Sequence, residues 1–202
     1  MKRRVDCAVL MAGVMALAGC SILKPQADPS RFYVLTSTAT RPENVNPSSP
    51  GLTIGVGPIK LPDYLDRTQL VTRLGPNRLA FSEYDRWAEP LERNLPRVLI
   101  ENLALLLNTE KIVSLPSFVP VPLQYEVPIE IRSFESNSQG VVELVARWAV
   151  RSPAEANLLK TGETRITETG GSETEEVVAA LSRAVGRLSE QIASDIQGLA
   201  QH

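Results

Sequence analysis

The sequence predicts a single domain of the α/β class, more closely α+β, in which a mixed, largely antiparallel sheet carries two long helices and includes a β-hairpin. Two observations support this fold: apolar residues recur every three or four positions in residues 91–107 and 177–199, and alternate with polar residues in several other stretches. The 202-residue chain, which is 43% hydrophobic, can bury one sizeable core, and nothing in it indicates a second domain.

The first nineteen residues have the pattern of a bacterial lipoprotein signal peptide. Three basic residues follow Met1, and the apolar run after them is shorter than the ~20 residues that span a bilayer. The run ends in Leu-Ala-Gly-Cys, so we expect Cys20 to be acylated and to become the new N-terminus. Ser21 favours sorting to the outer membrane, which places the domain in the periplasm. We therefore assign residues 1–19 to the signal peptide, 20–30 to a lipid-anchored tether and 31–202 to the domain.

Composition narrows the classes of function. The chain has 21 Lys and Arg against 23 Asp and Glu, and removal of the signal peptide leaves 18 against 22. A mildly acidic chain without a basic block lacks the electrostatic footprint of a nucleic-acid-binding protein. Cys7 leaves with the signal peptide and Cys20 carries lipid, so no disulfide is expected and stability must come from packing.

The first half of the domain reads as strands, a hairpin and a helix. Strands are predicted at 31–37 and 52–56, separated by a loop at 38–50 that is rich in Pro, Ser, Thr and Asn. Residues 68–74 and 79–82 flank Gly-Pro-Asn-Arg, which predicts a hairpin. An amphipathic helix should then run to about Leu107, with Pro90 near its start. Pro96 implies that this helix either begins later or kinks there.

The second half predicts a long antiparallel hairpin and a terminal helix. A short strand at 111–115 and a Pro-rich segment at 116–122 precede alternating strands at 125–131 and 142–150, joined by a turn at 137–140, and a third strand follows at 158–167. Pro128 indicates an edge strand or a bulge. Ser172 and Glu175 have the spacing of a capping box before the helix at 177–199.

Recognisable catalytic devices are missing from the sequence. His202 is the only histidine, and there is no nucleophile elbow, P-loop or dinucleotide fingerprint. Asp63 with Asp66, and the acidic residues at 173–176, could support acid–base chemistry, but solvated turns and the helix dipole explain them more simply. We expect no catalytic residues, no metal and no cofactor.

Two motifs carry a family resemblance. Pro-Asp-Tyr-Leu-Asp-Arg lies at residues 62–67, and Arg-Trp-Ala-Glu-Pro-Leu lies at 86–91. Together with Phe-Tyr-Val-Leu at 32–35, they resemble the PqiC/YmbA family of ABC-type transport auxiliary lipoproteins. The resemblance covers nearly the whole mature chain. It implies a periplasm-facing lipoprotein that works with an MCE-domain protein in carrying lipid between the inner and outer membranes, as an auxiliary subunit and not as an enzyme.

The two motifs supply the candidate partner-binding residues, which are Pro62, Asp63, Tyr64, Leu65, Arg67 and Trp87. Tyr64 and Leu65 are either exposed contacts for a partner or residues that fold back over the sheet edge. Trp87 either seals a lipid pocket or anchors an interface, or it is core.

A polar cluster of Asp63, Arg67, Arg73 and Arg86 is also expected to order this region.

Three functions stay open at this level. The leading one is a lipid-anchored adaptor that docks or caps an MCE-domain conduit at the outer membrane. The second is a periplasmic lipid carrier with a pocket between apolar helix faces, and the third is an enzyme that uses carboxylates without histidine. A homo-oligomer is compatible with each, because periodicity does not count protomers.

Overall fold

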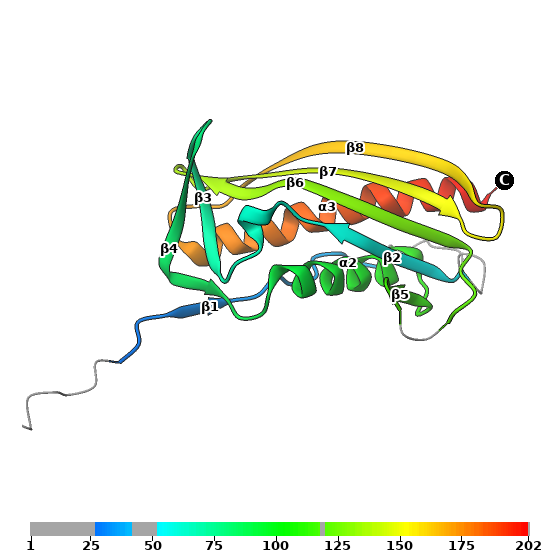
Figure 1. Cartoon of the computed structure of the whole chain (residues 1–202), viewed down its shortest axis with the longest axis horizontal. Coiled ribbons are helices and arrows are strands. Elements are labelled where there is room, and N and C mark those ends of the chain that lie inside the picture. Colours follow the sequence, from blue (N-terminus) through cyan, green and yellow to red (C-terminus); the bar gives the residue numbers. More distant parts are fainter. Residues whose placement is uncertain (1–26, 42–51, 118–119, 202) are drawn as a thin grey trace, which may run out of the picture.

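A computed structural model describes residues 27–41, 52–117 and 120–201; the predicted signal peptide, Cys20, most of the predicted tether and most of the predicted 38–50 loop lie outside these residues. Within the described part, eight strands form one sheet and two α-helices pack against it (Figure 1). This arrangement confirms the predicted α+β class. The elements in order are β1 (Arg31–Tyr33), β2 (Ile54–Lys60), η2 (Asp63–Leu65), β3 (Gln69–Gly75), β4 (Arg78–Trp87), α2 (Leu91–Leu107), β5 (Ile112–Ser114), β6 (Tyr125–Asn137), β7 (Val141–Ser152), β8 (Asn157–Thr169) and α3 (Thr174–Ala200).

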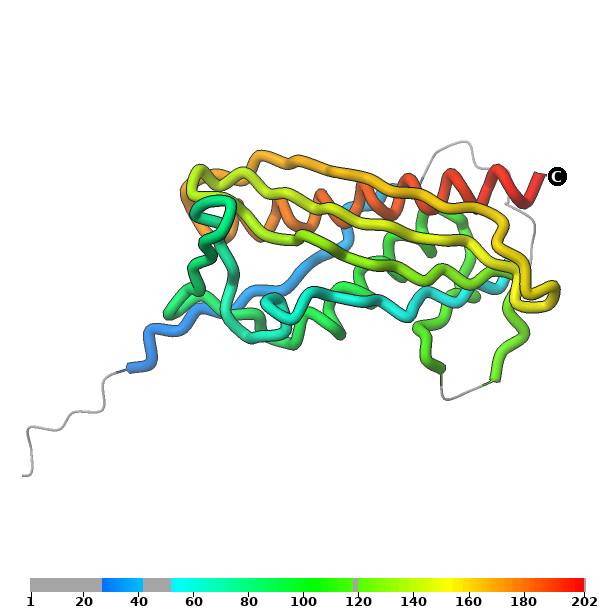
Figure 2. The backbone as a smooth tube through the Cα atoms, turned by 45° about the horizontal axis from the view of Figure 1, so that its top comes forward, coloured from blue at the N-terminus to red at the C-terminus, as the bar shows by residue number. Residues whose placement is uncertain are grey.

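Strand β6 is the centre of the sheet. On one side it pairs antiparallel with β7, which pairs antiparallel with β8, so the predicted three-stranded unit is confirmed. On its other side β6 pairs in parallel with two strands in succession, first with β2 and then, at Ser136 and Asn137, with β3. The sheet therefore divides into two branches, β2–β5 and β3–β4–β1, and the β3–β4 hairpin rises at one end of the molecule (Figures 1 and 2).

The sequence predicts either an edge strand or a bulge at Pro128, which lies in β6. Because β6 is paired on both sides, the edge-strand alternative is wrong. The bulge is on the neighbouring strand, where the register of β2 against β6 shifts between Val56 and Ile59. Gly57 lies in this bulge with φ of 121°, and a Cβ there would lie 2.6 Å from the carbonyl oxygen of Leu115. Only glycine fits this turn of the backbone.

One hydrophobic core lies between the sheet and the helices. The inward residues of β6 and β7 alternate as predicted; α3 packs on β7 and β8, and α2 packs on β2, β5 and α3. Helix α2 begins directly after Pro90 and continues through the partly exposed Pro96, so the later start is wrong. Trp148 is 5% exposed and donates a hydrogen bond from Nε1 to Asp195 of α3. This contact joins β7 to α3.

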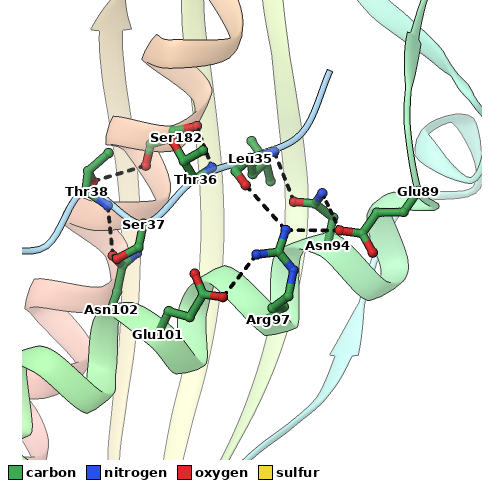
Figure 3. Close-up of polar contacts among 10 residues, drawn as sticks. All are labelled: Leu35, Thr36, Ser37, Thr38, Glu89, Asn94, Arg97, Glu101, Asn102 and Ser182. Carbon is green, nitrogen blue, oxygen red and sulfur yellow. Dashed lines mark hydrogen bonds and ion pairs between the residues drawn. The ribbon is translucent and has the colours of Figure 1, made fainter. Parts of the chain in front are cut away.

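The predicted strand at 31–37 is shorter than expected, because residues 35–38 run between α2 and α3 (Figure 3). Their backbone groups bond to helix side chains instead of a neighbouring strand. The Leu35 amide donates to Asn94 (3.1 Å), the Thr36 amide to Ser182 (3.2 Å), and the Thr38 and Ala39 amides to Asn102 (3.1 and 3.0 Å). Three buried polar residues of the helices therefore replace a β-ladder.

The start of α3 is shifted by one residue from the expected capping box. Glu173, not Ser172, is the N-cap, and its partner is Glu176, not Glu175. Thr174, the first helical residue, donates from its hydroxyl to the carboxylate of Asp85 on β4 at 3.1 Å. That contact fixes the helix start against the sheet.

Candidate functional site

The motif loop at residues 62–67 folds back onto the protein. Pro62 precedes the 3₁₀ turn η2, and Leu65 at its end is 3% exposed and belongs to the core. Tyr64 is half-buried, and its hydroxyl donates a hydrogen bond of 2.8 Å to Glu135 of β6. Of the two alternatives for Tyr64 and Leu65, the structure therefore shows the one in which they cover the sheet.

Glu135 is the residue that holds this loop in place. It is 2% exposed, and its carboxylate accepts hydrogen bonds from Tyr64, from Arg73 Nε (2.6 Å), from the Ser133 hydroxyl (3.0 Å) and from the Phe134 amide (2.8 Å). A buried carboxylate is tolerated when paired and hydrogen-bonded in this way. Loop, hairpin and central strand are thus joined at one side chain.

This cluster also has a defined charge state. Burial, followed by the hydrogen bond to Glu135 and its negative charge, raises the pKa of Tyr64 to about 12, so the phenol is neutral at physiological pH. The hydrogen bond to Glu135 raises the pKa of Arg73 above its ordinary value. Arg73 remains 35% exposed at its side chain while Glu135 is buried. The pair therefore consists of a fixed anion and a cation that still contacts water.

The remaining loop residues form the outer surface. Asp63, Asp66 and Arg67 are exposed, and the Arg67 guanidinium lies 4.0 Å from the ring centre of Phe81 on β4. The expected polar cluster is wrong in its membership. No ion pair between described residues joins Asp63, Arg67, Arg73 and Arg86 to one another, because Arg73 pairs with Glu135 and Arg67 stacks on an aromatic ring instead.

Trp87 ends strand β4 and is 6% exposed in the core. It also lines a cavity of about 660 Å³ between the β3–β4 hairpin, the end of β6 and the start of α3. Its other large apolar side chains are Leu65, Leu70, Val71, Phe81, Phe134, Val177 and Leu181. The structure therefore shows the core alternative for Trp87, whose side chain also lines a cavity.

Asp85 is at the polar side of this cavity. Its carboxylate accepts hydrogen bonds from Arg31 (2.7 Å), Tyr33 (3.2 Å), Ser82 (3.1 Å) and Thr174 (3.1 Å). Burial alone would raise the pKa of Asp85, but the hydrogen bonds from Arg31, Ser82 and Thr174 outweigh it and hold that pKa below its usual value. Strands β1 and β4 and helix α3 are fixed together at this carboxylate.

Neither carboxylate cluster was identified from the sequence. The signal for Glu135 was an acidic residue between Phe134 and Ser136, whose partners on β7 are the apolar residues Leu144 and Val142. In the described residues, no group of three or more His, Cys, Asp or Glu side chains could hold a metal ion. None of the helices in this part of the chain is long and apolar enough to cross a membrane.

Solved structures share this fold. An uncharacterised protein superposes with a TM-score of 0.67 at 18% identity, over 83% of this chain and 98% of the other. A protein from Xanthomonas campestris superposes with a TM-score of 0.70 at 15% identity, over 85% of this chain and 98% of the other. At these identities the likeness shows the fold alone.

The search of curated proteins found no match. The family model of the ABC-type transport auxiliary lipoprotein component matches residues 33–193, which include the 62–67 loop, the Glu135 cluster and the Trp87 cavity. The chain therefore belongs to the ABC-type transport auxiliary lipoproteins, the YmbA/PqiC-like family.

Proposed function

We propose that this protein is a non-enzymatic adaptor, anchored in the outer membrane through lipid on Cys20, that docks or caps the MCE-domain conduit of an intermembrane lipid transport system. The family supports an auxiliary role in ABC-type transport. The sequence Leu-Ala-Gly-Cys-Ser at residues 17–21 supports lipidation and sorting to the outer membrane.

The observation that carries the docking role is the fixed conformation of the 62–67 loop. Tyr64 is bonded to Glu135 and Leu65 is buried in the core. Asp63, Asp66 and Arg67 therefore present a preformed polar surface. A surface that is already ordered loses little conformational entropy when a partner binds. In this proposal Tyr64 positions the loop, while Asp63 and Arg67 contact the MCE-domain protein.

Co-isolation from cells tests the docking role. The MCE-domain protein is quantified after crosslinking with the full lipoprotein, with Arg67→Glu and with Arg151→Glu, an exposed arginine at the other end of the sheet on β7. We expect Arg67→Glu to reduce recovery at least about tenfold, equivalent to about 1.4 kcal/mol, and Arg151→Glu to leave it unchanged. Equal recovery with both variants would remove the 62–67 loop from the interface.

The cavity beside Trp87 favours a second candidate function, the binding of one lipid chain. Its volume of about 660 Å³ is in the range of small-molecule sites, and its large side chains are mainly apolar. Mass spectrometry of lipid extracted from the purified protein tests this. If the protein carries lipid, we expect stoichiometric phospholipid in the extract and a loss of it in Ala80→Phe, which places a ring in the cavity. Protein that is purified free of lipid would reject the carrier function.

A further inference from the structure

Exposed apolar side chains are concentrated at one end of the protein. Among the described residues, six large hydrophobic side chains are exposed, and five of them lie on β1, directly after it, or on the β3–β4 hairpin. We call these five the apolar end: Phe32 (62% exposed), Val34 (42%), Leu74 (39%), Phe81 (43%) and Tyr84 (43%). The sixth is Leu158 on β8, with 61% exposed.

The elements of the apolar end lie together in space. Strand β1 and the β3–β4 hairpin are at the same end of the molecule in both views, and the C-terminus of α3 is at the opposite end (Figures 1 and 2). Leu158 follows the turn between β7 and β8, which is at the α3 C-terminal end. The two groups of exposed apolar residues are therefore separated by the length of the domain.

The tether joins the domain at the apolar end, where Arg31 begins β1. Cys20 is eleven residues before Arg31, so its lipid lies within about 40 Å of Arg31 even if the chain is extended. Arg31 bonds to Asp85, which bonds to the first residue of α3. That helix has 27 residues and is about 40 Å long. The far end would reach the same bilayer only if the whole tether ran back along the domain.

The charges of the apolar end suit a phospholipid surface. Residues 31–33 and 69–87 contain four arginines; Arg31 and Arg73 pair with the buried carboxylates of Asp85 and Glu135, which leaves Arg78 and Arg86 against Glu83. Arginine donates to phosphate oxygens, and aromatic side chains are favoured at the level of the headgroups.

We propose that the apolar end docks on the bilayer that holds the lipid of Cys20, with Phe32 of β1 and Tyr84 of β4 in the headgroup region, while the ring of Phe81 is stacked against Arg67 of the 62–67 loop. This inference rests on the lipidation of Cys20 in the proposed function. The domain then stands on the membrane with the long axis of α3 directed away from it. The C-terminal end of α3 and the β7–β8 turn are presented to the periplasm.

The test uses the full lipoprotein in vesicles of phosphatidylethanolamine and phosphatidylglycerol that contain brominated acyl chains. Cys7 leaves with the signal peptide and Cys20 is acylated, so Phe32→Cys, Tyr84→Cys and Leu158→Cys each carry one free thiol for a fluorophore. Phe32 and Leu158 are matched in exposure. We expect quenching several-fold stronger at positions 32 and 84 than at position 158.

Each other outcome would overturn the proposal. Equal quenching at positions 32 and 158, or none at 32 and 84, would show that the apolar end is not on the bilayer. Self-quenching at position 32 that rises with protein density, without quenching by bromine, would assign this end to a second copy of the chain. Intact mass separates these results from a failure of lipidation, because an unacylated Cys20 would be seen directly.

Discussion

Replacement of Glu135 by glutamine is expected to destabilise the protein by about 2–4 kcal/mol. Four hydrogen bonds reach this carboxylate, and Arg73 supplies its counter-charge. A hydrogen bond to a charged group contributes about 1.5–3 kcal/mol, and breaking a buried ion pair costs about 3–5 kcal/mol. The loss of stability should be smaller than the sum of these contributions, because glutamine keeps one carbonyl oxygen and the partly exposed Arg73 can be rehydrated.

The assay is urea unfolding of the chain from residue 20 onward with Cys20→Ser, and the control is Glu143→Gln. Glu143 is directly opposite Glu135 in the β6–β7 ladder, but its side chain is 40% exposed and pairs with Arg165. We expect this control to change stability by less than about 1 kcal/mol. If the two variants differ by less than about 0.5 kcal/mol, the Glu135 cluster does not hold the loop as described.

Three further predictions concern the 62–67 loop, the segment between α2 and α3, and the sheet. Because the pKa of Tyr64 is raised to about 12 in the folded protein, its contribution to stability is intact below about pH 10 and is lost as pH rises from 10 toward 12, where the unfolded phenol ionises first. Tyr64→Phe should flatten this decline in the free energy of unfolding measured at several pH values. An unchanged slope would refute the prediction. Asn102→Ala removes the acceptor for three hydrogen bonds and should lower the free energy of unfolding by about 2 kcal/mol; a loss under about 0.5 kcal/mol would show that water replaces it. Gly162→Ala places a Cβ 2.1 Å from the Trp148 ring and should lower the free energy of unfolding by about 1–3 kcal/mol in a thermal unfolding assay. The control Gly75→Ala, whose Cβ would have nothing within 4 Å, should be nearly neutral. Equal effects of the two variants would contradict the packing of Gly162 against Trp148.

Local patterns were sufficient to predict most of the elements. The Gly-Pro-Asn-Arg turn located the β3–β4 hairpin, and the spacing of leucines located α2. The alternation of apolar residues predicted which faces of β6 and β7 are buried. These features depend on residues that are neighbours in the chain, so their signal is present in any short window of sequence.

Contacts between distant segments were not predictable in the same way. Residues 34–39 have strand-forming composition, but Asn94, Asn102 and Ser182 from two helices supply their hydrogen-bond partners. Glu135 lies 71 positions from Tyr64, so the motif at 62–67 gave no indication of what would hold it. The sequence predicted a turn at residues 62–67, but the exposure of its side chains depended on these distant partners.

The most direct test of the adaptor function is photo-crosslinking in the native envelope. A photoreactive residue is placed at Asp66, which is exposed on the loop, and separately at Glu155, which is exposed in the turn between β7 and β8. Adducts of the full lipoprotein are identified by mass spectrometry. The proposal predicts an MCE-domain adduct at position 66 that is absent at 155; adducts with phospholipid alone, or with the MCE-domain protein only at 155, would contradict it.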